Sequence, residues 1–172
     1  MTTEQLRHRM PPILKALKER SLRGRTPVEG LRRTECAYHG WDTVHADAAS
    51  WEPFAPGDAF GGLEAHHCFK GTVTLPEASA GKRVVCLDVN HNEFDLAACA
   101  VPGESHELAL YVYCNTPARD VFLRVETAER DDDVTGLYYD LRAPYEVCAL
   151  LADDDTRAIG IMKHLNRALN LL

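Results

Sequence analysis

Five segments between residues 68 and 130 alternate apolar and polar side chains, which is the pattern of strands with one buried face. In CFKGTVTLP, Phe69, Val73 and Leu75 share one face, lysine and threonine residues occupy the other, and Pro76 ends the strand. The other segments are KRVVCLDV, NEFDLAACAV (with Phe94, Leu96 and Ala98 in step), HELALYVYCN and DVFLRVETAER. The turn-forming sequences PEASAGK, VPGES and NTPARD separate these segments. Short strands with turns between them predict an antiparallel, jelly-roll-like β-sandwich over residues 31–130.

Helical patterns flank this region. Residues 3–20 carry a partial apolar stripe that Pro11 and Pro12 interrupt, which predicts one helix or two short ones. Residues 21–30 are punctuated by glycine and proline and are predicted to be a linker. The expected first segment, residues 1–30, is therefore a basic helical arm with its linker.

Residues 131–172 repeat apolar side chains every three or four positions, which predicts a pair of helices. Asp131 to Asp133 suit the start of the first helix, and Pro144 is expected to kink it. Asp153 to Asp155 separate it from the second, whose apolar stripe continues to Leu172 without a capping residue. We expect this stripe to pack against further protein. The predicted fold class is α+β, with a helical arm, a β-sandwich and a helical pair.

The composition predicts a cytoplasmic protein. No run approaches the roughly 20 apolar residues of a membrane span, and the first 20 residues lack the apolar core of a signal peptide. The six cysteines form no CxxC motif, and most lie inside apolar runs such as VVC and YVYC. We therefore expect reduced, largely buried thiols.

The net charge of −7 is unevenly distributed along the chain. Residues 1–33 contain nine Lys or Arg and three acids, whereas the remaining residues are strongly acidic. No aromatic residue precedes Tyr38, and an acidic body repels phosphate groups. We therefore predict that the basic arm lies against an acidic body or partner, and we expect neither nucleic acid nor a membrane as a partner.

The sequence His66-His67-Cys68 raises the possibility of a metal site. On a strand, His66 and Cys68 face one side and His67 faces the other. His66, Cys68 and His91 are weak zinc candidates, because no closed set of four ligands is present. The favoured interpretation is that His66 or His67 is a rim histidine hydrogen-bonded to the backbone and that Cys68 belongs to the core.

Other chemistry-bearing motifs are sparse. No pair among the 26 acidic residues is singled out as a glycosidase pair, and GxSxG, P-loop and GxGxxG motifs do not occur. Tyr38, Trp41, Trp51 and Phe54 are candidates for a platform that stacks on sugars. Aromatic residues at the entrance of a sandwich are more often part of the core, and we favour that interpretation.

Six segments occur in an order that resembles a known enzyme family. They are WEPFAPGDAFGG, HHCFKGTVTLPEASAGKRV, LDVNHNEFDL, GESHELALYVYCN, VTGLYYDLRAPYEVCALL and IMKHLNRALNLL. Together they resemble the N-terminal region of cytosolic-type α-mannosidases of glycoside hydrolase family 38, over about residues 31–172. The resemblance implies a non-catalytic β-sandwich domain whose closing helices lead into a separate α/β barrel. That barrel would hold zinc or a similar divalent ion and the aspartate nucleophile, so no catalytic residue is expected in this chain.

The resemblance also implies partners and a site. The chain would contact an α-mannosidase catalytic domain, or itself, through the C-terminal helices, and mannose-containing sugars are candidate ligands. The candidate carbohydrate-binding residues are Trp41, Trp51, Asn90 and His91. The alternative functions are a stand-alone carbohydrate-binding module and a small metal-binding module.

One departure from the family pattern lies near residue 87, where VVC runs directly into LDV. The family has a further strand and turn at this point, so one β-hairpin is missing. We expect its loss to expose a sheet edge or to fuse two strands. It also weakens any role transferred to Asp88, Asn90 and His91.

Overall fold

A computed structural model of the chain describes residues 3–88, 92–152 and 154–171. It contains helices and antiparallel sheets, so the predicted α+β class is confirmed. The chain divides into two compact units, which we call the β unit, Gly24–Glu129, and the helical unit, Met1–Arg23 with Arg130–Leu172. No helix formed by the described residues is long and apolar enough to cross a membrane.

Two four-stranded sheets and one two-stranded sheet are present, with the orders β1-β10-β6-β7, β3-β2-β5-β8 and β4-β9. Their strands are β1 (Leu22–Pro27), β2 (Leu31–Glu35), β3 (Glu52–Phe54), β4 (Ala59–Phe60), β5 (Ala65–Thr74), β6 (Arg83–Leu87), β7 (Glu93–Ala97), β8 (Ser105–Cys114), β9 (Val121–Phe122) and β10 (Glu126–Arg130). A short helix, α2 (Trp41–His45), and a 3-10 turn, Glu77–Ser79, lie between strands.

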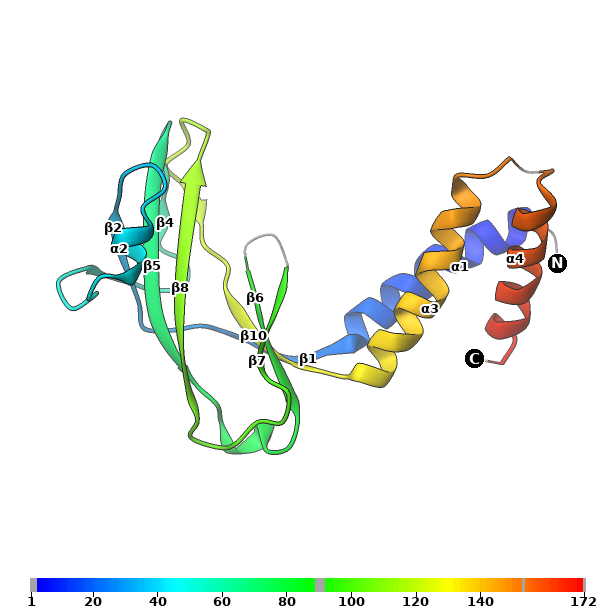
Figure 1. Cartoon of the computed structure of the whole chain (residues 1–172), viewed down its shortest axis with the longest axis horizontal. Coiled ribbons are helices and arrows are strands. Elements are labelled where there is room, and N and C mark those ends of the chain that lie inside the picture. Colours follow the sequence, from blue (N-terminus) through cyan, green and yellow to red (C-terminus); the bar gives the residue numbers. More distant parts are fainter. Residues whose placement is uncertain (1–2, 89–91, 153, 172) are drawn as a thin grey trace. The chain divides into compact units, whose positions relative to one another are not determined.

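The longest strands, β5 and β8, form the longest ladder of the β unit (Figure 1). They pair antiparallel from Ala65 opposite Cys114 to Thr74 opposite Ser105 without interruption. Because residues that face each other across a ladder share a face of the sheet, this register decides which side chains meet. β2 lies along the other side of β5, with Thr34 opposite Cys68.

Both four-stranded sheets contribute to one apolar core. Its buried members include Leu31, Phe54, Phe60, Phe69, Val73, Leu75, Val84, Cys86, Ala97 and Val125. Phe69 is completely buried, and its ring centroid lies 5.0 Å from that of Phe54 and 5.1 Å from that of Phe60, edge to face. The predicted inner face of CFKGTVTLP is thus confirmed.

Three details of the β unit differ from the sequence expectations. The expected linker 21–30 contains strand β1, in which every side chain except that of Leu22 is exposed. Its side chains therefore do not alternate between buried and exposed positions, and the sequence pattern did not indicate a strand. DVFLRVETAER forms two strands, β9 and β10, that belong to different sheets. Phe94 was expected to be in step with Leu96 and Ala98, but its side chain is 54% exposed, and the pairing of β6 with β7 shifts register between Val84 and Val85.

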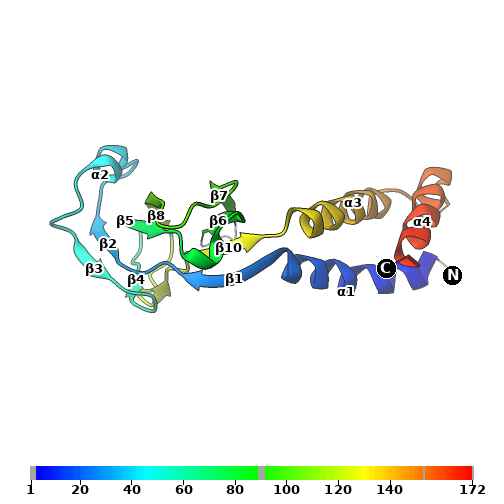
Figure 2. The same cartoon turned by 90° about the horizontal axis from the view of Figure 1, so that it is seen from below.

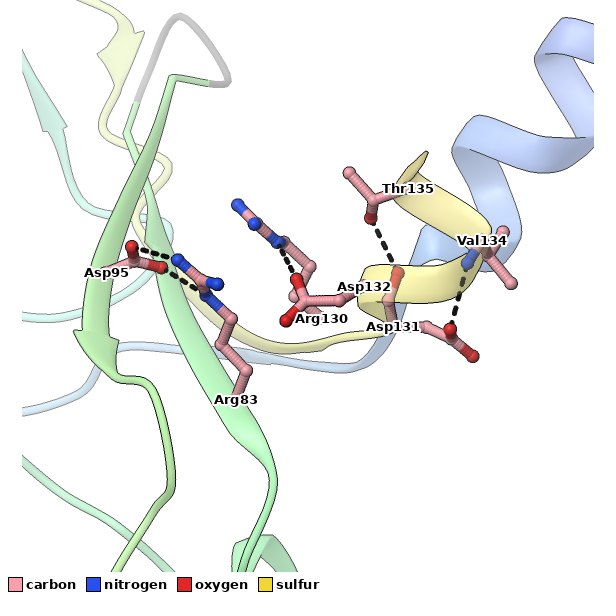
Figure 3. Close-up of polar contacts among 7 residues, drawn as sticks. All are labelled: Arg83, Asp95, Arg130, Asp131, Asp132, Val134 and Thr135. Carbon is pink, nitrogen blue, oxygen red and sulfur yellow. Dashed lines mark hydrogen bonds and ion pairs between the residues drawn. The ribbon is translucent and has the colours of Figure 1, made fainter. Parts of the chain in front are cut away.

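Of the two consequences expected near residue 87, an exposed sheet edge or a fusion of two strands, the fusion does not occur, because β6 and β7 remain separate and pair with each other. Around their connection, the Asn92 amide donates to Asp88 Oδ1 at 2.9 Å and the Asp88 amide donates to the Asn92 carbonyl oxygen at 3.1 Å. Arg83 on β6 also pairs with Asp95 on β7 (Figure 3). β7 is the terminal strand in the order of its sheet. Asn90 and His91 lie outside the described residues.

The helical unit consists of α1 (Thr3–Ser21), α3 (Asp132–Ala149) and α4 (Thr156–Leu169). Helix α1 continues through Pro11 and Pro12 as a single helix. It packs beside α3, with α4 against them (Figures 1 and 2), so the basic arm and the C-terminal helical pair form one unit instead of two separate segments. The reason is burial: α1 contributes Leu6 and Met10 to a core completed by Leu141, Cys148, Met162, Leu165 and Leu169.

Both C-terminal helices begin at aspartate caps. Asp131 accepts a hydrogen bond from the Val134 amide at 3.1 Å, and the Thr135 hydroxyl donates to the Asp131 carbonyl oxygen at 2.7 Å (Figure 3). Asp155 caps α4, and its contact with Arg157 lowers the pKa of its carboxyl to about 2. The acidic runs thus act as helix starts, as predicted. Asp153 and Leu172, named in the sequence patterns, lie outside the described residues.

Candidate functional site

Strand β5 presents different chemistry on its two faces. His67 and Phe69 point into the apolar core, opposite Val112 and Leu110 of β8. His66 and Cys68 lie on the other face, opposite Tyr113 and Tyr111. The prediction that His66 and Cys68 share a face, with His67 on the other, is confirmed. This second face brings together a group of aromatic and polar side chains from distant parts of the chain.

We call this group the aromatic patch and define it as Tyr38, His39, Glu64, His66, Tyr111 and Tyr113. The imidazole of His66 stacks on the ring of Tyr113 with a centroid distance of 4.9 Å. Its Nδ1 lies 2.6 Å from the Tyr111 hydroxyl, and the ring of Tyr38 meets it edge-on at 5.6 Å. The Tyr111 hydroxyl also accepts a hydrogen bond from the His39 amide at 3.3 Å. His66 is therefore at the centre of the patch, held between rings and by a hydrogen bond.

A carboxylate closes one side of the patch. The Tyr113 hydroxyl donates to Glu64 Oε1 at 2.8 Å, and this hydrogen bond to a carboxylate raises the pKa of Tyr113 above its ordinary value. The patch therefore offers aromatic faces next to a hydroxyl, an imidazole and a carboxylate. This combination suits ligands with apolar ring faces and several hydroxyl groups, such as hexoses.

Two residues of the patch have a strained backbone conformation. His39 and Glu64 each have a φ of 57°, and they are the two non-glycine residues with positive φ among the described residues. Such left-handed conformations are uncommon outside glycine, and they persist where the surrounding structure fixes them, often at functional sites. The contact of the His39 amide with Tyr111 and that of the Glu64 carboxylate with Tyr113 fix both residues here.

The patch has exposed ring surface available for a ligand. The side chain of Tyr38 is 71% exposed and that of Tyr113 is 45% exposed. Trp41, which begins α2, is 63% exposed, and its amide donates to the His39 carbonyl oxygen at 2.5 Å. Large exposed aromatic residues gathered on one surface are characteristic of binding sites.

A small core supports this surface from beneath. Val44, Trp51 and Cys68 are buried together, with Cys36 and Tyr111 packed against them. Trp51 is only 8% exposed, so it offers no free ring face to a sugar. It packs instead against Val44 of α2 and Cys68 of β5. Of the predicted carbohydrate-binding residues, Trp41 is exposed next to the patch, Trp51 is beneath it, and Asn90 and His91 lie outside the described residues.

Two of the weak metal candidates, His66 and Cys68, make other contacts, and the third, His91, lies outside the described residues. Nδ1 of His66 is bonded to Tyr111, and the buried Cys68 thiol contacts Cys36 and the carbonyl oxygen of Gly40. Within residues 3–88, 92–152 and 154–171, no group of three or more histidine, cysteine or acidic side chains is arranged to hold a metal ion.

A polar groove of about 620 Å³ lies next to the α2 segment. Its cations are engaged by the protein itself: Lys70 Nζ lies 2.9 Å from both the Ala46 carbonyl oxygen and Glu107 Oε1. Arg32 donates to the carbonyl oxygens of Ala49 and Trp51 at 3.1 and 2.9 Å. These charges therefore hold the chain after α2 onto the sheet.

Sequence reasoning missed His39, Glu64, Tyr111 and Tyr113. One signal was present: in HELALYVYCN the two tyrosines alternate with Leu110 and Val112, which places them on the face opposite the core. What the sequence did not contain was the register of β5 against β8, which brings both tyrosines to His66.

Burial of His67 makes the stability of the fold depend on pH. The side chain is 1% exposed, with its ring centroid 5.2 Å from that of Phe60, and burial, with a smaller contribution from Arg33, lowers its pKa below 6.5. The unfolded chain therefore binds a proton more readily than the folded chain. We expect the free energy of unfolding to fall as the pH drops below about 6.5, where an unperturbed histidine takes up its proton.

Urea unfolding at pH 7.5 and pH 5.5 measures this effect. His67→Phe should reduce the difference between the two pH values, whereas His45→Gln, at an exposed position, should leave it unchanged. An equal pH dependence in the wild-type chain and His67→Phe would contradict the assignment.

Comparisons with known proteins add no relative: no protein-family model matches the chain, and no curated protein matches it significantly.

Proposed function

We propose that this chain is the non-catalytic N-terminal domain of an α-mannosidase-like glycoside hydrolase of the cytoplasm. The observation that carries the proposal is the ordered series of six sequence segments that resembles this region of family 38 enzymes. Further support comes from the strands that these segments form in the β unit. HHCFKGTVTLP supplies β5, KRVV begins β6 and ELALYVYC supplies most of β8, and these strands bring apolar side chains to one core.

In this proposal the two four-stranded sheets are the layers of a β-sandwich of jelly-roll type. The helical unit provides the contact with a catalytic barrel or with a second copy of the chain. An apolar groove of about 410 Å³ on this unit supports such a contact, and it is lined by Leu137, Leu141, Pro144, Ile161, Leu165 and Ala168, with Asp140 and His164. The parent enzyme would hydrolyse α-mannosides with a divalent metal held by the barrel.

Two measurements test this function. The purified chain should release no nitrophenol from 4-nitrophenyl α-mannoside in the presence of zinc or cobalt, and metal-dependent release would overturn the non-catalytic assignment. The chain should also co-elute in size-exclusion chromatography with a family 38 catalytic barrel that was produced without its own N-terminal region. Ile161→Glu should prevent co-elution, whereas Lys163→Glu, on the exposed part of α4, should not. Separate elution of the wild-type chain would count against the proposal.

A second candidate function is carbohydrate binding by the aromatic patch, which the exposed rings of Tyr38 and Tyr113 beside Glu64 and His66 favour. Mannose or mannobiose should change tryptophan fluorescence through the exposed Trp41. Tyr113→Ala should weaken binding about fivefold, because an aromatic stacking contact is worth on the order of 1 kcal/mol.

The matched control for this titration is Tyr139→Ala, which removes a similarly exposed tyrosine from α3. It should bind the sugar as the wild-type chain does. If no fluorescence change occurs at sugar concentrations up to tens of millimolar, or if both variants bind equally, the patch has no such role.

A further inference from the structure

Two cysteine side chains meet beneath the aromatic patch. Cys36 follows β2 directly, and its amide donates to the His66 carbonyl oxygen of β5 at 2.9 Å. Cys68 lies two residues further along β5 on the same face, so the two cysteines are diagonal neighbours across adjacent strands. Their sulfur atoms are 3.1 Å apart, and the Cys68 thiol donates toward Cys36. A disulfide bond would require the sulfur atoms to approach by only about 1 Å more.

The two thiols differ in access. Cys36 is partly exposed, whereas Cys68 is completely buried. Burial, together with the neighbouring Cys36 thiol, raises the pKa of Cys68 to about 12, so it carries almost no thiolate at neutral pH. A dissolved oxidant therefore reaches Cys36 first. Cys68 is then placed to attack the oxidised sulfur of Cys36 from within the fold, where its proximity compensates for the low fraction of Cys68 that is thiolate.

The backbone around Cys36 is fitted closely to its sulfur. A Cβ atom at Gly40 would lie 2.9 Å from Cys36 Sγ, so the absence of a side chain at this position lets the loop close over the thiol. The Gly40 carbonyl oxygen also lies 3.8 Å from Cys68 Sγ. Residues 36–40 thus pack against the sulfur pair and leave Cys36 partly exposed, and the same loop carries Tyr38 and His39 of the aromatic patch.

We propose that Cys36 and Cys68 form a reversible disulfide bond when a hydroperoxide oxidises the chain. The Cys36 thiolate attacks the peroxide oxygen, which forms a sulfenic acid and, with hydrogen peroxide, releases water after protonation. The Cys68 sulfur then attacks the Cys36 sulfur and displaces hydroxide, which leaves as water with the proton of the Cys68 thiol. Two thiols and one hydrogen peroxide thus give one disulfide and two waters.

The disulfide would fix the loop of Tyr38 and His39 to the central strand of the sheet. Because the two cysteines are 32 residues apart, it would also close a ring that contains α2, β3 and β4. The oxidised chain should therefore melt at a higher temperature than the reduced chain, and dithiothreitol should reverse the shift. This inference depends on the fold beneath the patch and holds whether or not the chain serves a mannosidase.

The test uses the full chain with Cys99→Ser, which removes the exposed cysteine. After treatment with hydrogen peroxide and alkylation of free thiols, digestion with trypsin and Asp-N should separate TECAYHGW from DAFGGLEAHHCFK. Mass spectrometry should find these two peptides joined in the oxidised sample and separate after dithiothreitol. Free thiols should fall by two per chain.

Cys36→Ser in the same background should abolish both the joined peptides and the melting shift, whereas Cys114→Ser, at another buried cysteine, should retain them. The digest of the Cys99→Ser chain does not depend on the folding of either further variant. Recovery of both peptides as free thiols, or of Cys36 only as sulfinic or sulfonic acid, would overturn the proposal.

Discussion

Replacing Phe69 with alanine should lower the free energy of unfolding of the β unit by about 3–5 kcal/mol. The ring is completely buried and packs edge to face against Phe54 and Phe60 at the centre of a core shared by both four-stranded sheets. Its removal would leave a cavity that β5 cannot close, because the strand is paired along its length with β8 and at residues 67–70 with β2. Urea unfolding followed by the fluorescence of the buried Trp51 measures the change.

Phe122→Ala is the matched control, because it removes the same ring from a position that is 61% exposed. Its effect should stay within about 0.5 kcal/mol. Equal destabilisation by the two substitutions would show that the core described for the β unit is wrong.

Met10→Ala should destabilise the helical unit by about 2–5 kcal/mol. Met10 is completely buried, and with Leu6 it anchors α1 to the core formed with α3 and α4. Both tryptophans are in the β unit, whereas most helical residues are in the helical unit, so two probes can be compared. Circular dichroism at 222 nm, a helix-sensitive wavelength, should show an earlier loss of signal, while the tryptophan transition keeps its midpoint.

Leu171→Ala provides the control for Met10→Ala, since Leu171 is 89% exposed and should tolerate truncation. A shift of both probes by the same amount in Met10→Ala would indicate that the two units unfold as one cooperative body. No shift in either probe would show that α1 does not depend on its buried stripe.

The sequence predicted those parts of the fold that depend on side-chain periodicity. The inner face of β5 and the buried stripe of α4 were both correct, because alternation and helical repeats report burial directly. It did not predict β1, since an edge strand with exposed polar side chains is held by backbone hydrogen bonds that leave no periodic signal. The union of α1 with the C-terminal helices was also missed, because the contact joins the two ends of the chain.

The candidate site was predicted only in part for a related reason. Alternation correctly placed His66 and Cys68 on one face, but the partners of that face come from β8 and from the loop after β2. Strand register and loop conformation are long-range properties, and no local pattern encodes them. Trp51 was named as a candidate for stacking on sugars, while the favoured interpretation placed such aromatic residues in the core, and the structure buries Trp51 in the small core beneath the patch.

The β5 ladder restricts how this surface can change during evolution. His66 and Cys68 on one face alternate with His67 and Phe69 on the other, in a register fixed along the whole strand. Inserting or deleting one residue within β5 would turn the core rings outward and carry the patch histidine into the interior. Relatives of this chain should therefore diversify the patch by substitution at fixed positions and confine length variation to the loops beyond the ladder.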